Sequence, residues 1–119
     1  YLGHYKSMKV KPSRKKINAY KPAEIVVQRP VKQSKCALGR NAYPLGHAHR
    51  IPLFLLVNIL GGQGMNSRLN LALREKYGFV YSIDALYTPY TDTGLFAVFF
   101  GTEPRQMNRC ISLIKKEFA

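Results

Sequence analysis

An arginine and a tyrosine, Arg74 and Tyr81, are the side chains in this sequence best suited to chemistry. They lie seven residues apart, the first in the last turn of an expected helix and the second on an expected strand that doubles back. Both can therefore face one cleft. A guanidinium and a phenol donate hydrogen bonds to a substrate carbonyl and to the oxyanion that forms when water attacks it. The pair suits substrate binding during hydrolysis, but on residue types and spacing alone an exposed helix-end arginine and a half-buried strand tyrosine are the preferred interpretation.

The three histidines do not form a recognisable metal site. Zinc-binding helices of one class of hydrolytic enzymes carry the pattern H-x-x-E-H, and none of His4, His47 and His49 has a glutamate at that spacing. His47 and His49 can present two imidazoles on one side of a loop, but no Asp or Cys lies nearby as a third ligand. We therefore expect no metal, no cofactor and no catalytic residue within this chain.

Residues 60–82 are expected to position the pair as a continuous loop, helix and strand. A glycine-rich turn opens the stretch, and its free backbone torsions allow a tight bend or the close approach of another segment. Asn66 and Ser67 offer side-chain oxygens that can cap a new helix. Gly78 is the expected end of that helix, because glycine readily adopts the left-handed conformation. The glycines of the turn are Gly61, Gly62 and Gly64.

Hydrophobic periodicity predicts further elements on both sides of this stretch. We expect strands at residues 24–28, 35–43, 79–87 and 95–100, the last of them central and covered on both faces or nearly so. A mostly buried helix begins after His49 and ends at Gly61. A last helix opens near Pro104, and its apolar residues share one inward face: Met107, Cys110, Ile111, Ile114 and Phe118. The order β-β-α-α-β-β-α predicts an α+β domain, an antiparallel sheet with helices packed on one face.

The length and composition fit one globular domain. The chain has 119 residues, of which 46% are hydrophobic, and this content argues against a disordered chain. We expect residues 1–22 to be a basic lead-in or linker and residues 23–119 to be the domain. Residues 1–50 hold twelve Lys and Arg against one acid, Glu24, within a net charge of +13. Such a run can meet phosphates or an acidic surface, but without a base-reading motif a solvated linker is the preferred interpretation.

The two cysteines, Cys36 and Cys110, both fall among apolar residues, which favours buried thiols over a disulfide or a metal site. No apolar run approaches the roughly 20 residues of a membrane span, and no signal peptide is visible. The first residue is Tyr1 and the last residues stop inside a helical pattern. We expect a truncated piece of a longer protein, in the cytoplasm rather than the periplasm.

The same central stretch carries a resemblance to a known family. Residues 73–82 follow the pattern L-R-E-K-x-G-x-x-Y-S, and the similarity extends over residues 51–102 and more faintly back to residue 25. This pattern resembles the pitrilysin/insulinase-type zinc metallopeptidases (inverzincins), specifically the domain that does not carry the zinc. The resemblance implies a bacterial-type enzyme of two half-clamshells, in which the other half activates a zinc-bound water. Arg74 and Tyr81 match, residue for residue, the pair that reaches the substrate from the half lacking zinc.

These implications define the expected function: a non-catalytic, substrate-binding or structural domain that hydrolyses no peptide alone. The expected partners are a zinc-bearing H-x-x-E-H domain or subunit, in a homo- or heterodimer or on one chain, and a peptide substrate.

An alternative rests on Gly61, Gly62 and Gln63, the GGQ tripeptide of peptidyl-tRNA hydrolases, in a basic chain that could bind RNA or the ribosome. The tripeptide directly follows a predicted buried helix and lacks the flanking pattern of those proteins, so nucleic acid is the less favoured partner. Gln63 also departs from the peptidase pattern, which usually has glycine there.

Overall fold

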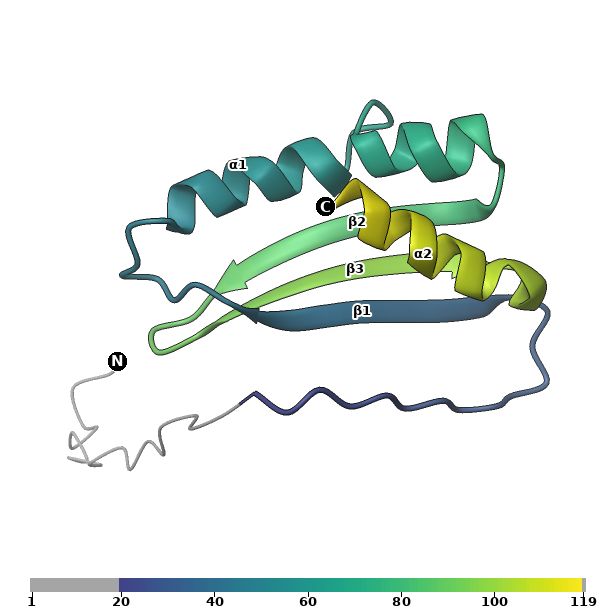
Figure 1. Ribbon diagram of the computed structural model, residues 1–119, viewed down its shortest axis with the longest axis horizontal. Helices are drawn as coiled ribbons and strands as arrows, with labels where there is room; N and C mark the ends of the chain where they lie inside the picture. Colours follow the sequence, from purple (N-terminus) through teal and green to yellow (C-terminus); the bar gives the residue numbers. More distant parts are fainter. Residues whose placement is uncertain (1–19, 119) are drawn as a thin grey trace, which may run out of the picture.

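The computed structural model describes residues 20–118, and within them three antiparallel strands form a single sheet in the order β1-β3-β2 (Figure 1). Helices cover one face of the sheet, so the predicted α+β fold is confirmed. The central strand β3 pairs with both neighbours along its whole length. The elements are β1 (Ser34–Ala42), α1 (Arg50–Gly61), the π-helix η1 (Asn70–Lys76), β2 (Val80–Pro89), β3 (Gly94–Thr102), the 3-10 turn η2 (Pro104–Gln106) and α2 (Met107–Glu117).

The core lies between the sheet and its helical layer. Leu69 and Leu73 from the helix that follows the glycine-rich turn, and Cys110 and Ile114 from α2, are at most 2% exposed. They pack against Val80 and Ile83 of β2 and Val98 and Phe100 of β3 in one cluster. The predicted inward face of the last helix is therefore correct, and both cysteines are free thiols, one buried and one partly buried.

The strand predicted at residues 24–28 is wrong, because this segment has no strand pairing in the structure. Ile25, Val26 and Val27 are 85%, 75% and 68% exposed. The segment runs extended alongside β1 in Figure 1, and the bond from the Tyr20 hydroxyl to the Gly39 carbonyl (3.4 Å) ties it to that strand. Strand propensity alone cannot make a strand where no backbone partner lies within hydrogen-bonding distance.

The prediction of a mostly buried first helix is also wrong. Within α1 the buried residues are Val57, Leu60 and Gly61, which face β2. The other side of the helix is apolar yet half exposed, because no other part of residues 20–118 covers it. Its exposed side chains are Ile51, Phe54, Leu55, Leu56 and Ile59.

The sheet face away from the helices is also less covered than predicted. β3 is the central strand as expected, but Leu95 and Phe99 on this second face are 40% and 44% exposed. Sequence showed that the strand is apolar on both faces, and it could not show that only one face has a covering layer among the described residues.

The helix predicted after the glycine-rich turn is present, but most of it is a π-helix. Gly78 follows it with φ of 62°, in the left-handed region, and its N–H donates to the Arg74 carbonyl at 3.0 Å. This confirms the expected helix end. π-helical turns are rare and often occur at functional sites, and a short apolar periodicity does not distinguish them from α-helix.

The predicted lead-in falls almost wholly outside the described residues, as do His4 and the basic run at residues 6–16. Among the helices that the structure describes, none is both long and apolar enough to cross a membrane.

Candidate functional site

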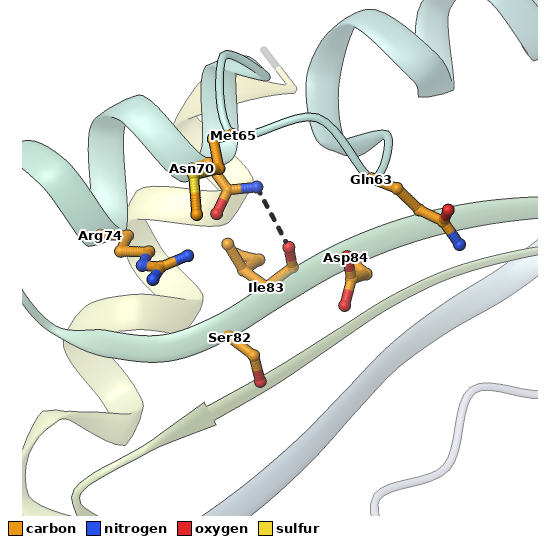
Figure 2. A pocket seen from close by; sticks show the side chains of 7 residues that line it. All are labelled: Gln63, Met65, Asn70, Arg74, Ser82, Ile83 and Asp84. Carbon is orange, nitrogen blue, oxygen red and sulfur yellow. Dashed lines mark hydrogen bonds between the residues drawn. The ribbon is translucent and has the colours of Figure 1, made fainter.

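A small cavity lies where the glycine-rich turn and η1 meet the edge strand β2. Its volume is about 150 Å³, and Figure 2 shows side chains from the turn, the helix and the strand arranged around it. The lining residues are Gln63, Met65, Asn70, Arg74, Ser82, Ile83 and Asp84. The stretch that sequence analysis selected as the organising unit therefore forms a concave site in the folded chain.

Arg74 lines this cavity from η1, as Figure 2 shows. It takes part in no ion pair with any residue between 20 and 118, where the recorded pair joins Arg68 to Glu117 at 2.9 Å. Asp84 lines the same cavity but lies beyond ion-pair distance of Arg74. The guanidinium therefore keeps its hydrogen-bond donors available for a ligand.

Tyr81 lies next to the cavity in sequence but does not line it. The pairing of β2 with β3 shifts register between Val80 and Ser82, so Tyr81 occupies a β-bulge and is 58% exposed. Strict alternation along a strand would place Tyr81 on the same face as Ile83, and the bulge breaks that alternation. Bulges often change the direction of a side chain next to a functional site. Here the bulge leaves the Tyr81 phenol largely in solvent, one residue before the cavity-lining Ser82.

The glycine-rich turn is fixed against the sheet at its first residue. A Cβ on Gly61 would lie 2.5 Å from the Ala85 Cβ and 3.0 Å from the Ala85 nitrogen, so only glycine allows α1 to end this close to β2. A Cβ on Gly62 would lie 2.7 Å from the Asn58 carbonyl oxygen. This contact between α1 and β2 determines where Gln63 and the cavity begin.

Asn70 is the residue of the site that sequence analysis missed. It is 6% exposed, and its Nδ2 donates to the Ser67 hydroxyl at 2.9 Å, the Ile83 carbonyl at 3.4 Å and the Gly64 carbonyl at 3.5 Å. One amide therefore joins the glycine-rich turn, the helix and the edge strand. Ser67 accepts this bond, and no side-chain capping bond was found at the start of η1. A polar residue between Leu69 and Leu73, four positions before Arg74, was the signal available in the sequence.

The histidines lie in a separate aromatic cluster before α1. The ring of His47 stacks on Tyr43 with centroids 4.1 Å apart, and His49 meets both rings edge-on. The His47 Nδ1 accepts the backbone N–H of His49 at 3.1 Å, which occupies one imidazole nitrogen. Nowhere in residues 20–118 do three His, Cys, Asp or Glu side chains come together as metal ligands would.

Comparison with protein families matches the whole chain, residues 1–119, to the peptidase M16 inactive domain. The uncharacterized zinc protease YmxG of Bacillus subtilis is 32% identical over 87 residues, which cover 73% of this chain and 21% of that protein. An uncharacterized zinc protease of Streptomyces coelicolor is 32% identical over 92 residues, 77% of this chain and 20% of that protein. The chain thus spans about a fifth of the length of these relatives.

A mitochondrial relative and two solved structures extend the comparison. The alpha subunit of the human mitochondrial-processing peptidase is 35% identical over 57 residues, 48% of this chain and 11% of that protein. The crystal structure of a peptidase M16 inactive domain from Pseudomonas fluorescens has a TM-score of 0.71 and 26% identity, over 76% of this chain and 22% of that chain. A protease from Helicobacter pylori has a TM-score of 0.64 over 75% of this chain and 22% of that chain; at 21% identity it supports the fold alone.

Proposed function

Because the chain belongs to the peptidase M16 inactive-domain family, we propose that it is the non-catalytic, substrate-holding domain of a zinc-dependent metalloendopeptidase. The observation that carries the proposal is Arg74, a guanidinium that lines a cavity and is free of ion pairs within residues 20–118. Its N–H groups are available to bind a carbonyl oxygen of a peptide. The stretch around it keeps the L-R-E-K-x-G-x-x-Y-S pattern that carries the resemblance.

The zinc belongs to a different domain or subunit in this proposal. The described residues do not fit a zinc site, because they bring no three potential ligands together. The relatives in Bacillus subtilis and Streptomyces coelicolor are named zinc proteases, and the matched part of this chain covers only about a fifth of each. The remaining length of such a protein, or a second subunit, would supply both the metal and the base that activates water. When bound there, zinc would polarise the scissile carbonyl of the peptide and the water molecule that the metal binds.

Arg74 and Tyr81 would act on the substrate rather than on the metal. Arg74 would hold a peptide carbonyl at the cavity, and a cationic donor in a partly enclosed site stabilises the negative charge that develops on an attacked carbonyl. Tyr81 would add a phenolic donor when the second half of the enzyme closes over the bulge. Gly61, Gly62 and Gly64 would form the loop that lets the peptide pass close to the backbone.

The alternative assignment as a GGQ-type hydrolase or an RNA-binding module receives no support from the described residues. Gly61, the first residue of the tripeptide, is buried at the junction of α1 and β2, and Gln63 is exposed at the edge of the cavity. The basic run that would contact nucleic acid lies outside the described residues.

The test is the kinetics of peptide hydrolysis by the whole enzyme, meaning this domain together with its zinc-bearing part. Arg74→Ala and Tyr81→Phe should each lower kcat/KM by roughly tenfold or more, because each removes a donor used in the transition state. Arg68→Ala is the matched control, since Arg68 is an exposed arginine of the same segment whose surface pairing with Glu117 contributes little. If Arg74→Ala behaves like Arg68→Ala while zinc content and folding are unchanged, Arg74 does not hold substrate.

A further inference from the structure

Asn70 has an unused hydrogen-bonding atom. Its Nδ2 faces two backbone carbonyls, Gly64 and Ile83, and the Ser67 hydroxyl. Carbonyl oxygens only accept, so the nitrogen must point toward them and the amide cannot be flipped. The Oδ1 is then fixed on the opposite side of the amide group.

This oxygen opens onto the cavity. Within residues 20–118 the Asn70 Oδ1 accepts no hydrogen bond. Every side-chain oxygen or nitrogen of these residues that is fully buried does have a hydrogen-bond partner. The oxygen therefore retains contact with open space, and the open space that Asn70 lines is the cavity. Figure 2 shows the nitrogen directed along its bond to Ile83 and the oxygen turned away from that bond, on the side where Arg74 lies.

Asn70 is almost completely buried, so its Oδ1 acceptor is held rigidly. Asn70 is 6% exposed, and its bonds to the turn, the helix and the strand remove its rotational freedom. An acceptor that is fixed in this way and has no protein partner gains more from a ligand donor than a mobile surface amide would. The site therefore offers one fixed acceptor and, from Arg74, one set of cationic donors.

We propose that Asn70 is a second substrate-binding residue, whose Oδ1 accepts a backbone N–H of an extended peptide while Arg74 donates to a carbonyl of the same peptide. The inference rests on the proposed peptidase function and specifies how that site reads its substrate. An extended residue presents its N–H and C=O on the same side of the chain, so one residue of the peptide satisfies both groups. A cavity of about 150 Å³ in another protein holds a benzene molecule. The cavity beside Asn70, at about 150 Å³, therefore has room for a single peptide unit.

The proposed interaction selects backbone conformation rather than side-chain type. Peptides that reach the site in extended form bring both groups to it, whereas a helical peptide uses the same N–H and C=O internally. Unfolded or extended substrate segments are therefore preferred, over a range of sequences.

The experiment replaces single backbone amides of a substrate by esters, which removes one N–H at a time. The probe is a quenched-fluorescence peptide chosen from a mixed-sequence library for cleavage by the wild-type whole enzyme, and kcat/KM is measured for each ester analogue. In the wild type, one position should lose roughly 3- to 10-fold beyond the others, the loss typical of one neutral hydrogen bond. In Asn70→Ala this extra loss should vanish, because the acceptor is already absent.

Ser67→Ala is the matched control. It removes one of the partners that hold Asn70 Nδ2 but keeps the Oδ1 acceptor, so it should keep the position-specific loss. If Asn70→Ala retains the full ester sensitivity, or if no ester position is singled out by the wild type, the inference is overturned while the proposed function stands. If the wild type cleaves no peptide, the proposed function itself fails, and the inference fails with it.

If Asn70→Ala does not fold, the wild-type ester scan still decides the question. The proposal requires one singled-out position there, and a flat scan contradicts it. Ser67→Ala then shows whether a loosened turn alone produces the same profile.

Discussion

Gly61→Ala should lower the free energy of unfolding by about 1 to 2 kcal/mol, because an added methyl group has no room between α1 and β2. The new Cβ would lie 2.5 Å from the Ala85 Cβ and 3.0 Å from the Leu69 Cδ1. Inserting one carbon into a well-packed contact costs about 1 to 3 kcal/mol. Alanine recovers part of this through its better helix propensity, worth at most about 1 kcal/mol at the end of a helix. Gly61 does not have a positive φ, so the loss comes from packing and not from backbone strain.

The measurement is urea unfolding followed by circular dichroism, together with the thermal midpoint. At about 0.7 kcal/mol of unfolding enthalpy per residue, a loss of this size lowers Tm by roughly 5 to 10 °C. Gly46→Ala is the matched control, because a Cβ there would meet nothing within 4 Å. This substitution should change the free energy of unfolding by less than about 1 kcal/mol, or raise it by restricting the unfolded chain.

A second substitution isolates the contact. Ala85→Gly removes the carbon nearest to the added methyl, so Gly61→Ala should cost less in its presence, with a coupling of at least about 0.5 kcal/mol. Equal effects of Gly61→Ala and Gly46→Ala, or additive effects of the Gly61 and Ala85 changes, would refute the close approach of α1 to β2. The position of the glycine-rich turn over the cavity depends on that approach.

Two further predictions concern the core beneath α2. The fully buried Thr102 hydroxyl donates to the Phe79 carbonyl at 2.5 Å. Thr102→Val should therefore lower the free energy of unfolding by about 1 to 3 kcal/mol, and by more than Thr102→Ser, which keeps the donor. Equal urea midpoints for the two variants would contradict this prediction. Burial, with Cys110 and Glu24 adding to it, raises the pKa of Cys36. Because the thiolate is the reactive form, iodoacetamide should label Cys36 more slowly than a free thiol at pH 8, and the labelling rate should rise toward higher pH. Cys110, which is 0% exposed, should react only after unfolding. Mass spectrometry of labelled peptides distinguishes the two sites, and labelling of Cys36 at the rate of a free thiol would contradict the raised pKa.

The sequence predicted the architecture best where periodicity and stop signals agreed. Gly78 and the inward face of α2 were read correctly, because a left-handed glycine and an apolar stripe are local features. The strand at residues 24–28 was predicted from Ile25, Val26 and Val27, whose propensity is real but whose pairing partner is a property of the whole sheet. Local pattern cannot show that a partner strand is missing.

The site was only partly accessible to sequence reasoning. Arg74 was selected from its spacing and motif, and it does line the cavity. The bulge at Tyr81 was not predicted, because a one-residue insertion leaves no mark on an alternating pattern of apolar and polar residues. Asn70 was passed over, since a lone amide in an apolar helix looks like a solvent-facing residue until the folded chain brings Gly64 and Ile83 to its nitrogen.

The central claim is that this chain holds substrate for a zinc site located elsewhere, and its most direct test is peptide hydrolysis by separated and combined parts. The rate of cleavage of a quenched-fluorescence peptide is measured for this domain alone, for the zinc-bearing part alone, and for both together, with bound zinc quantified in each sample. We predict no cleavage and no stoichiometric zinc for this domain alone, weak cleavage by the zinc-bearing part alone, and a rise of at least roughly tenfold on combination that Arg74→Ala abolishes. Full activity of the zinc-bearing part without this domain, or hydrolysis by this domain alone, would contradict the account.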